Sequence, residues 1–191
     1  SIQIGQSGNQ IGSIFFNHLS EEHFLGFDGQ YSGEQSDPSL DKFQTFYNET
    51  NQNKYYPRAF LIGSDPNNIG KVLAGKDLEI YIYNYQNQDR SHFRTIWPLF
   101  YYNHSLEYGE QIIESIRKET EKCNSLQGFQ IVHSLGGGSG SGLCSYILKE
   151  LQDEYPDRRK STFSIFPSEK VENFFYEQYN FILSLPFLID F

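Results

Sequence analysis

Several residue types are scarce in this sequence of 191 residues: methionine is absent, tryptophan occurs once and cysteine occurs twice. Cys123 and Cys144 lie far apart and form no Cys-x-x-Cys pair, so we expect reduced intracellular thiols rather than a disulfide framework. No stretch approaches about eighteen consecutive apolar residues, and therefore no membrane-spanning helix is predicted. The N-terminus also lacks the basic-then-apolar pattern of a secretion signal.

Basic residues are also few, with 15 Lys and Arg against 24 Asp and Glu, which gives a formal net charge of −9. This charge disfavours nucleic acid and anionic membranes as general partners. Aromatic residues are abundant, with 17 Phe and 14 Tyr, enough for the core of one folded domain at this length. No methionine begins the chain, and residues 181–191 are mostly apolar. We therefore expect one domain over residues 1–191 that is incomplete at both ends.

Strand and helix patterns alternate along the chain, which predicts an α/β fold: a mostly parallel sheet with helices on both faces. In such sheets the ligand lies at the carboxyl ends of the strands. The loops expected there are residues 5–10, 63–66, 136–142 and 167–170, and a further long loop is predicted over residues 26–54. The expected strands are residues 2–4, 57–62, 129–135 and 162–166, and the expected helices begin at residue 11 and cover 107–122, 142–154 and 174–185.

Residues 136–142, here called the glycine run, read Gly-Gly-Gly-Ser-Gly-Ser-Gly between an apolar stretch and a helical pattern. A strand, a glycine turn and a helix in this order aim backbone N–H groups and a helix N-terminus at an anion. The run lacks the lysine of a Walker loop and fits neither the dinucleotide fingerprint nor the nucleophile elbow. From these residues alone, a structural turn and a ligand site both stay open.

Several motifs in order make a more specific pattern. Residues 5–12 read Gly-Gln-Ser-Gly-Asn-Gln-Ile-Gly, residues 56–59 read Tyr-Pro-Arg-Ala, and residues 133–142 read His-Ser-Leu followed by the glycine run. Glu-Gln-Tyr-Asn at residues 177–180 extends the pattern almost to the end. Together these motifs resemble the tubulin family, most closely the β type. The resemblance implies a Rossmann-like, tubulin-type GTP-binding domain, which in that family is followed by an intermediate domain and a helical hairpin.

The resemblance also implies which residues bind the nucleotide, GTP or GDP. Gln6, Ser7 and Gln10 match the family's first loop, which touches phosphates and sugar, with capping of the helix by Ser7 and Asn9 as the alternative. Glu177 matches an acid that contacts the ribose, with an exposed helix charge as the alternative. The family's phosphate loop corresponds to Ser134, Gly136, Gly137, Gly138, Ser139 and Gly140.

One metal ligand is implied in the same way. Asp65 matches the acidic residue that the family uses near Mg²⁺, and a carboxylate is a suitable ligand for this ion. The family's usual Asp-Leu-Glu-Pro is replaced here by Gly-Ser-Asp-Pro at residues 63–66, so one carboxylate is lost. An ordinary Asp-Pro turn is the alternative reading.

The sequence departs from the family at the third loop, which aligns with about residues 96–99. Trp97 is too bulky for close backbone approach to a phosphate, and Pro98 has no N–H to donate. Recognition of the γ-phosphate is therefore not expected. In the family the acid that activates water comes from the intermediate domain of a neighbouring subunit, so no catalytic residue is assigned in this chain and its enzymatic status stays open.

Two functions follow from the resemblance. The first is a GTP-binding structural constituent of microtubules or an axoneme, with Mg²⁺ as an additional cofactor. The second is a non-hydrolysing structural paralogue that docks on microtubules with a static nucleotide or none. In both, the expected partners are other tubulin subunits and the microtubule lattice, with neither nucleic acid nor membrane. The expected location is the cytoplasmic cytoskeleton, with a cilium or basal body as a further alternative.

Overall fold

A parallel sheet of five strands organises the protein, seen in a computed structural model that describes residues 1–26, 28–33, 45–49, 54–63, 82–84, 96–168 and 174–190. The strand order is β5-β4-β1-β6-β7, so the first strand in the sequence lies at the centre. The strands are β1 (Ile2–Ile4), β4 (Phe60–Gly63), β5 (Ile82–Asn84), β6 (Gly128–Ser134) and β7 (Arg159–Ile165). All four strand pairings are parallel, as predicted.

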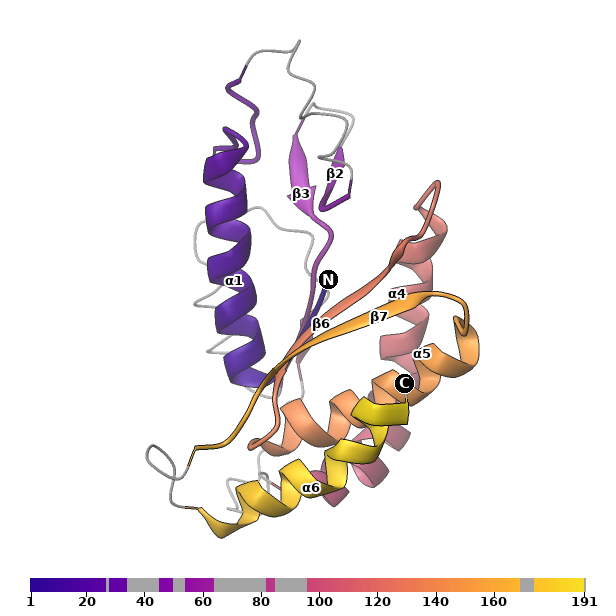
Figure 1. Cartoon of the computed structure of the whole chain (residues 1–191). Coiled ribbons are helices and arrows are strands. Elements are labelled where there is room, and N and C mark those ends of the chain that lie inside the picture. Colours follow the sequence, from indigo (N-terminus) through magenta and orange to yellow (C-terminus); the bar gives the residue numbers. More distant parts are fainter. Residues whose placement is uncertain are drawn as a thin grey trace.

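Helices cover both faces of this sheet (Figure 1). Of the helices that the structure describes, α1 lies on one face and contacts β1, β4 and β6, whereas α4, α5 and α6 lie on the other side. The helical elements are α1 (Gly5–Glu22), η2 (Leu99–Gly109), α4 (Glu110–Glu121), η3 (Ser139–Leu143), α5 (Cys144–Glu154) and α6 (Phe175–Asp190). The predicted α/β architecture is thus confirmed. In the described residues, no helix is both long and apolar enough to cross a membrane.

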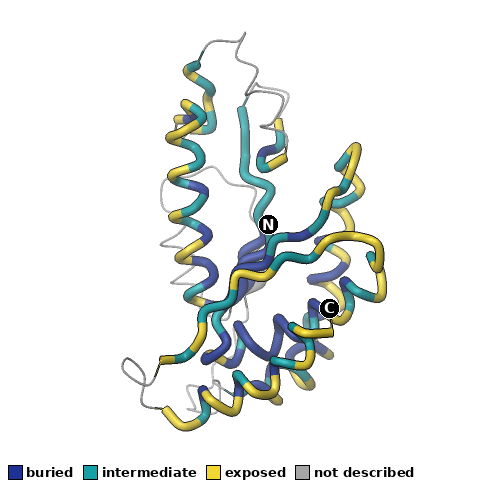
Figure 2. Tube along the Cα trace, viewed as in Figure 1, coloured by how far each residue is buried: buried dark blue, intermediate teal, exposed yellow. Residues whose placement is uncertain are grey.

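The main apolar core lies between the sheet and helices α4 and α5. Alternate strand residues, such as Ile2 and Ile4 in β1, project into it, as the two-residue period of a strand requires. From α4 the three isoleucines 112, 113 and 116 complete this core, as their helical spacing predicted. Figure 2 shows the buried strands at the centre and the exposed residues on the outer surfaces of the helices.

Helix α1 packs on the other face of the sheet through small residues. A Cβ atom added at Gly8 would lie 2.4 Å from the Val132 carbonyl oxygen, so only glycine permits this close approach to β6. The apolar spacing had placed Ile11 and Ile14 on the helix's apolar stripe, but their exposed fractions are 44% and 56%. The glycines, rather than the isoleucines, mark the buried face because the helix lies so close to the sheet.

Two predicted turns are wrong, because helices begin earlier than the spacing of apolar residues indicates. Residues 5–10 were predicted as a turn, yet α1 begins directly after β1, with a positive φ of 77° at Gly5 to redirect the chain. The second half of the glycine run is also helical, since η3 begins at Ser139. In both places the glycines lie inside or at the start of a helix, where sequence alone favours a loop.

Other boundaries also differ from the predictions. The predicted loop over residues 26–54 contains β2 (Tyr47–Glu49), which pairs with β3 (Tyr55–Pro57) in a separate antiparallel ribbon. The helix expected from residue 107 begins at Trp97, and its first part, η2, is π-helical, which hides it from a search at the period of an α-helix. Helix α6 continues to Asp190 despite Pro186.

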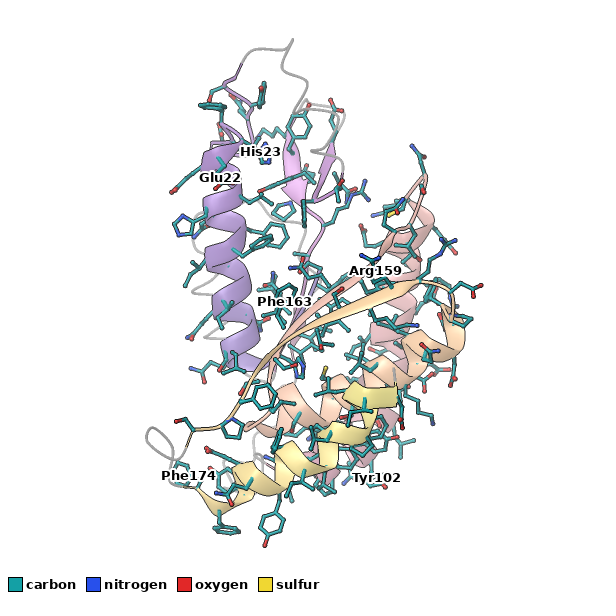
Figure 3. All side chains as sticks on the ribbon, in the orientation of Figure 1. Glu22, His23, Tyr102, Arg159, Phe163 and Phe174 are labelled. Atoms are coloured by element: carbon teal, nitrogen blue, oxygen red, sulfur yellow. The ribbon has the colours of Figure 1, made fainter. Side chains whose placement is uncertain are left out.

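An apolar surface remains at the edge formed by β7, the last strand of the described sheet. The exposed fraction of Phe163 in β7 is 56%, whereas Phe174, also exposed, lies apart from it just before α6 (Figure 3). Arg159 at the beginning of the same strand is exposed as well. Edge strands with such side chains are surfaces that proteins usually cover.

Candidate functional site

The starts of α1 and η3 meet at the carboxyl end of the sheet. Strands β1 and β6 are neighbours, so the segments that leave them emerge side by side. A Cβ atom added at Gly5 would lie 3.1 Å from Ser139 Oγ and 3.3 Å from the Gly140 nitrogen. The predicted meeting of residues 5–10 with the glycine run is confirmed, and loop residues 64–66 and 169–170 lie outside the described residues.

Both helix starts offer backbone N–H groups. The first N–H groups of a helix have no acceptor within it, and the aligned peptide dipoles place about half a positive charge there. The N-cap residues are Ile4 for α1 and Gly138 for η3, and neither provides a side-chain capping bond. The site therefore presents two adjacent positive helix ends whose donors can bind an anion, and this resolves the alternative for Ser7, which does not cap α1.

Within the glycine run, Gly137 faces open space. Its carbonyl oxygen accepts bonds from the backbone nitrogen of Ser141 at 3.0 Å and from Ser141 Oγ at 2.6 Å, which fixes the peptide on that side. A Cβ atom added at Gly137 would meet no atom within 4 Å. By contrast, a Cβ atom added at Gly140 would lie 2.5 Å from the Ser134 carbonyl oxygen. Gly140 is thus required for packing, whereas Gly137 leaves room for a ligand.

His133, at the end of β6, is hydrogen-bonded to the glycine run. Its Nδ1 lies 2.7 Å from the Gly140 carbonyl oxygen, which can only accept, so Nδ1 carries the proton and donates. Its Nε2 then accepts from Ser164 Oγ at 2.8 Å. Burial lowers the pKa of His133 below its usual value, although the bond to Gly140 opposes this change. This neutral ring, with both nitrogens hydrogen-bonded, has a structural role.

Asn180 holds the run from α6, and the sequence interpretation assigned it no role. Its Nδ2 donates to the Gly136 carbonyl oxygen at 2.7 Å, and its Oδ1 accepts from the Trp97 backbone nitrogen at 2.7 Å. The side chain is buried, with an exposed fraction of 1% for the residue. A signal was present, because an asparagine in an otherwise largely apolar helix needs partners for its amide.

The residues predicted for the first loop lie on the first turns of α1. Gln6 and Gln10 are exposed and four residues apart, so they share one face of the helix, and Ser7 is half-buried. Ser134 is half-buried at the end of β6. Glu177 is buried near the start of α6, which contradicts the alternative of an exposed helix charge. Asn180, on the next turn of that helix, connects it with the glycine run.

The hydrogen-bond donors at this site suit the phosphates of a nucleotide, whereas the predicted metal ligand is not among the described residues. Uncapped helix starts and an outward-facing glycine suit phosphate oxygens, because backbone N–H groups can approach them closely. In the part of the chain that the structure describes, no three His, Cys, Asp or Glu side chains gather closely enough to hold a metal ion. Asp65, the predicted Mg²⁺ ligand, lies outside the described residues.

Comparison with known proteins agrees with this geometry. The protein-family model described as "Tubulin/FtsZ family, GTPase domain" matches residues 1–191. The tubulin beta-2 chain of Emericella nidulans is 39% identical over 189 residues, which cover 99% of this chain and 42% of that protein. The tubulin beta-1 chain of Hypocrea rufa has the same identity and the same coverage. The chain thus spans less than half the length of these relatives.

Proposed function

Since the chain belongs to the Tubulin/FtsZ family and matches its GTPase domain, we propose that it binds a guanine nucleotide, GTP or GDP, at the junction of α1 and η3. The observation that carries this proposal is the pair of uncapped helix starts brought together beside the open Cα of Gly137. A dinucleotide-type ligand would need a different glycine spacing, and a Walker-type site would need a lysine that the run lacks.

In this proposal the chain's own contribution is to bind and orient phosphates. N–H groups of Gly137 to Gly140 donate to phosphate oxygens, each bond to a charged group contributing about 1.5–3 kcal/mol. The start of α1 adds roughly 0.3–1 kcal/mol through its dipole if exposed, and more where water is excluded. Gln6, Ser7 and Gln10 supply further polar contacts from α1. Ser139, at the start of η3, adds a hydroxyl beside Gly5.

The remaining cofactor contacts stand as parts of the same proposal. Glu177 would accept from the ribose hydroxyls, and its burial close to the residue that holds the run supports this role. Asp65 would support Mg²⁺ beside the phosphates, because a carboxylate oxygen is a ligand that this ion prefers. Titration of Mg²⁺ into the nucleotide complex of Asp65→Asn tests that part on its own.

At the level of the whole protein, we propose a tubulin-like structural constituent of microtubules or an axoneme. The matched relatives are named as tubulin beta chains, which supports tubulin subunits and the microtubule lattice as partners. The net charge of −9 agrees with the absence of nucleic acid and anionic membrane from the proposed partners. The proposed location is the microtubule cytoskeleton of the cytoplasm, including that of a cilium or basal body.

One observation favours the second function, a paralogue that does not hydrolyse its nucleotide. The resemblance aligns the family's third loop with about residues 96–99, where a helix begins at Trp97, and the Trp97 side chain is buried against Tyr101 with ring centroids 4.4 Å apart. Within the described residues 96–99, backbone packed in this way offers no free loop to a terminal phosphate. A nucleotide held by the glycine run without a response at the γ-phosphate would be static.

Release of bound nucleotide tests the first claim. The purified full-length protein is denatured, and the supernatant is separated by ion-exchange chromatography with GDP and GTP standards. The proposal expects close to one guanine nucleotide per chain, and a protein without nucleotide after incubation with excess GDP would overturn it. GDP alone, with no phosphate release when microtubules are added, would support the non-hydrolysing paralogue over the GTPase.

A further inference from the structure

Asn180 joins two segments that lie far apart in the sequence. Its amide bonds the Gly136 carbonyl oxygen on one side and the Trp97 backbone nitrogen on the other, each at 2.7 Å. Because Asn180 is buried, neither partner has water as a ready substitute, and losing either bond leaves a buried polar group unsatisfied. Both bonds are therefore expected to persist in the folded protein.

The bond to Gly136 also sets the direction of the next N–H group. A peptide unit is planar and trans, so its C=O and its N–H point in opposite directions. Asn180 holds the Gly136 carbonyl toward the interior, and the N–H of Gly137 in the same peptide must then point away from it. Gly137 is the residue whose Cα faces open space. Asn180 thus orients a donor of the site without itself lying on the exposed side.

A second set of contacts joins Trp97 to the other half of the glycine run. Trp97 Nε1 donates to Ser145 Oγ at 3.0 Å, and Ser145 Oγ donates to the Ser141 carbonyl oxygen at 2.8 Å. A Cβ atom added at Gly142 would lie 2.4 Å from the Trp97 carbonyl oxygen, so the two backbones are in direct contact. Movement of the run therefore requires movement at Trp97.

We infer that Asn180 is a positioning residue that couples the glycine run to the helix beginning at Trp97, so that a phosphate ligand at the run and the setting of that helix stabilise each other. The identity of the ligand rests on the proposed function, whereas the coupling itself rests on the contacts of Asn180 and Trp97. Coupling of this kind is reciprocal, so a change that fixes the start of the helix also strengthens ligand binding.

Two variants on α6 separate coupling from stability. Asn180→Leu keeps the side-chain volume and removes both bonds, while Ser184→Ala removes a buried bond from the same helix, from Ser184 Oγ to the Asn180 carbonyl oxygen. In the full-length protein, GDP is expected to bind about tenfold more weakly to Asn180→Leu and unchanged to Ser184→Ala. Thermal unfolding of both variants shows how much of any loss is due to stability.

Tryptophan emission gives a readout that a purely structural role would not change. Trp97 is the only tryptophan in this sequence, and its signal is the difference between the parent protein and Trp97→Phe. Saturating GDP is expected to change this emission in the parent protein and in Ser184→Ala, but not in Asn180→Leu. Equal changes in all three proteins would overturn the coupling.

Hydrogen exchange tests, without any ligand, whether Asn180 holds the glycine run in place. Amides of residues 135–143, followed by mass spectrometry, are expected to exchange faster in Asn180→Leu than in Ser184→Ala. If the parent protein binds no GDP, the proposed function fails, and this exchange result still supports or refutes the role of Asn180. If Asn180→Leu does not fold, Asn180→Asp replaces it, because its carboxylate still accepts from Trp97 but cannot donate to Gly136. Unchanged exchange in a folded Asn180 variant would refute the inference.

Discussion

A methyl group at Gly137 tests the proposed phosphate site most directly. Gly137 is not among the described glycines with positive φ, and its added Cβ would meet no atom within 4 Å. Gly137→Ala therefore introduces neither strain nor overlap in the protein itself. We expect the free energy of unfolding to change by no more than about 0.5 kcal/mol, or to rise slightly because alanine restricts the unfolded chain.

Nucleotide binding should respond quite differently. A phosphate oxygen bonded to backbone N–H groups lies about 2.9 Å from the nitrogens, and the new methyl group occupies the space beside them. If the ligand retreats by about 1 Å, two charge-assisted hydrogen bonds of about 1.5 kcal/mol each are lost. A loss of about 3 kcal/mol corresponds to roughly a hundredfold increase in Kd.

Gly140→Ala is the matched control because it has the opposite geometry. Its Cβ would lie 2.5 Å from the Ser134 carbonyl oxygen, so we expect it to lower the free energy of unfolding by about 1–3 kcal/mol. GDP affinity is measured by isothermal titration calorimetry, and stability is measured by urea denaturation. A Gly137→Ala protein with unchanged GDP affinity, or one with the stability loss of Gly140→Ala, would refute the assignment of the open side to the ligand.

Three further predictions concern stability. Burial lowers the pKa of His133, so its contribution is complete above the unfolded value of 6.5 and decreases as the pH falls toward the folded pKa; urea denaturation at pH 7.5 and 5.5 should show this loss in the parent protein but not in His133→Gln. Ile147→Ala should lower the free energy of unfolding by about 2–5 kcal/mol, because this core residue is fully buried, and a smaller loss would show that the core closes around the cavity. Gly8→Ala should cost about 1–3 kcal/mol by forcing α1 from β6, and wild-type thermal stability would contradict the close approach.

The fold class was predictable because strands and helices alternate in a pattern that few architectures fit. Parallel pairing, helices on both faces and the meeting of the two loops all followed from this alternation. Helix starts were not predictable from the same pattern. Glycine at residues 5 and 8 reads as a turn locally, whereas in the structure Gly5 lets the start of α1 approach Ser139 and Gly140, and Gly8 lets α1 lie against β6. Tertiary packing, absent from any local pattern, decided the conformation there.

The sequence predicted the backbone segments that form the candidate site, but not the side chains that hold those segments in place. The glycine run and the first loop were identified from their residues and from the tubulin resemblance. Asn180 and Trp97 were not assigned to the site's support, because their roles depend on bonds between segments more than eighty residues apart in the sequence, as in the contact of Asn180 Oδ1 with the Trp97 backbone. Such contacts leave only an indirect trace, such as a polar residue in an apolar helix.

The central place of β1 has a consequence for how the chain folds. Ile2 pairs with Phe60 on one side and with Ile131 on the other. The middle strand of the sheet can therefore pair only after these later parts of the chain have been synthesised. Pairings of such long sequence separation slow folding, since the loop must close before any contact stabilises it. During synthesis the edge of β1 that pairs with β6 therefore stays unpaired until β6 has left the ribosome, even after β4 is available for the other edge, and an unpaired apolar strand edge exposes the growing chain to aggregation.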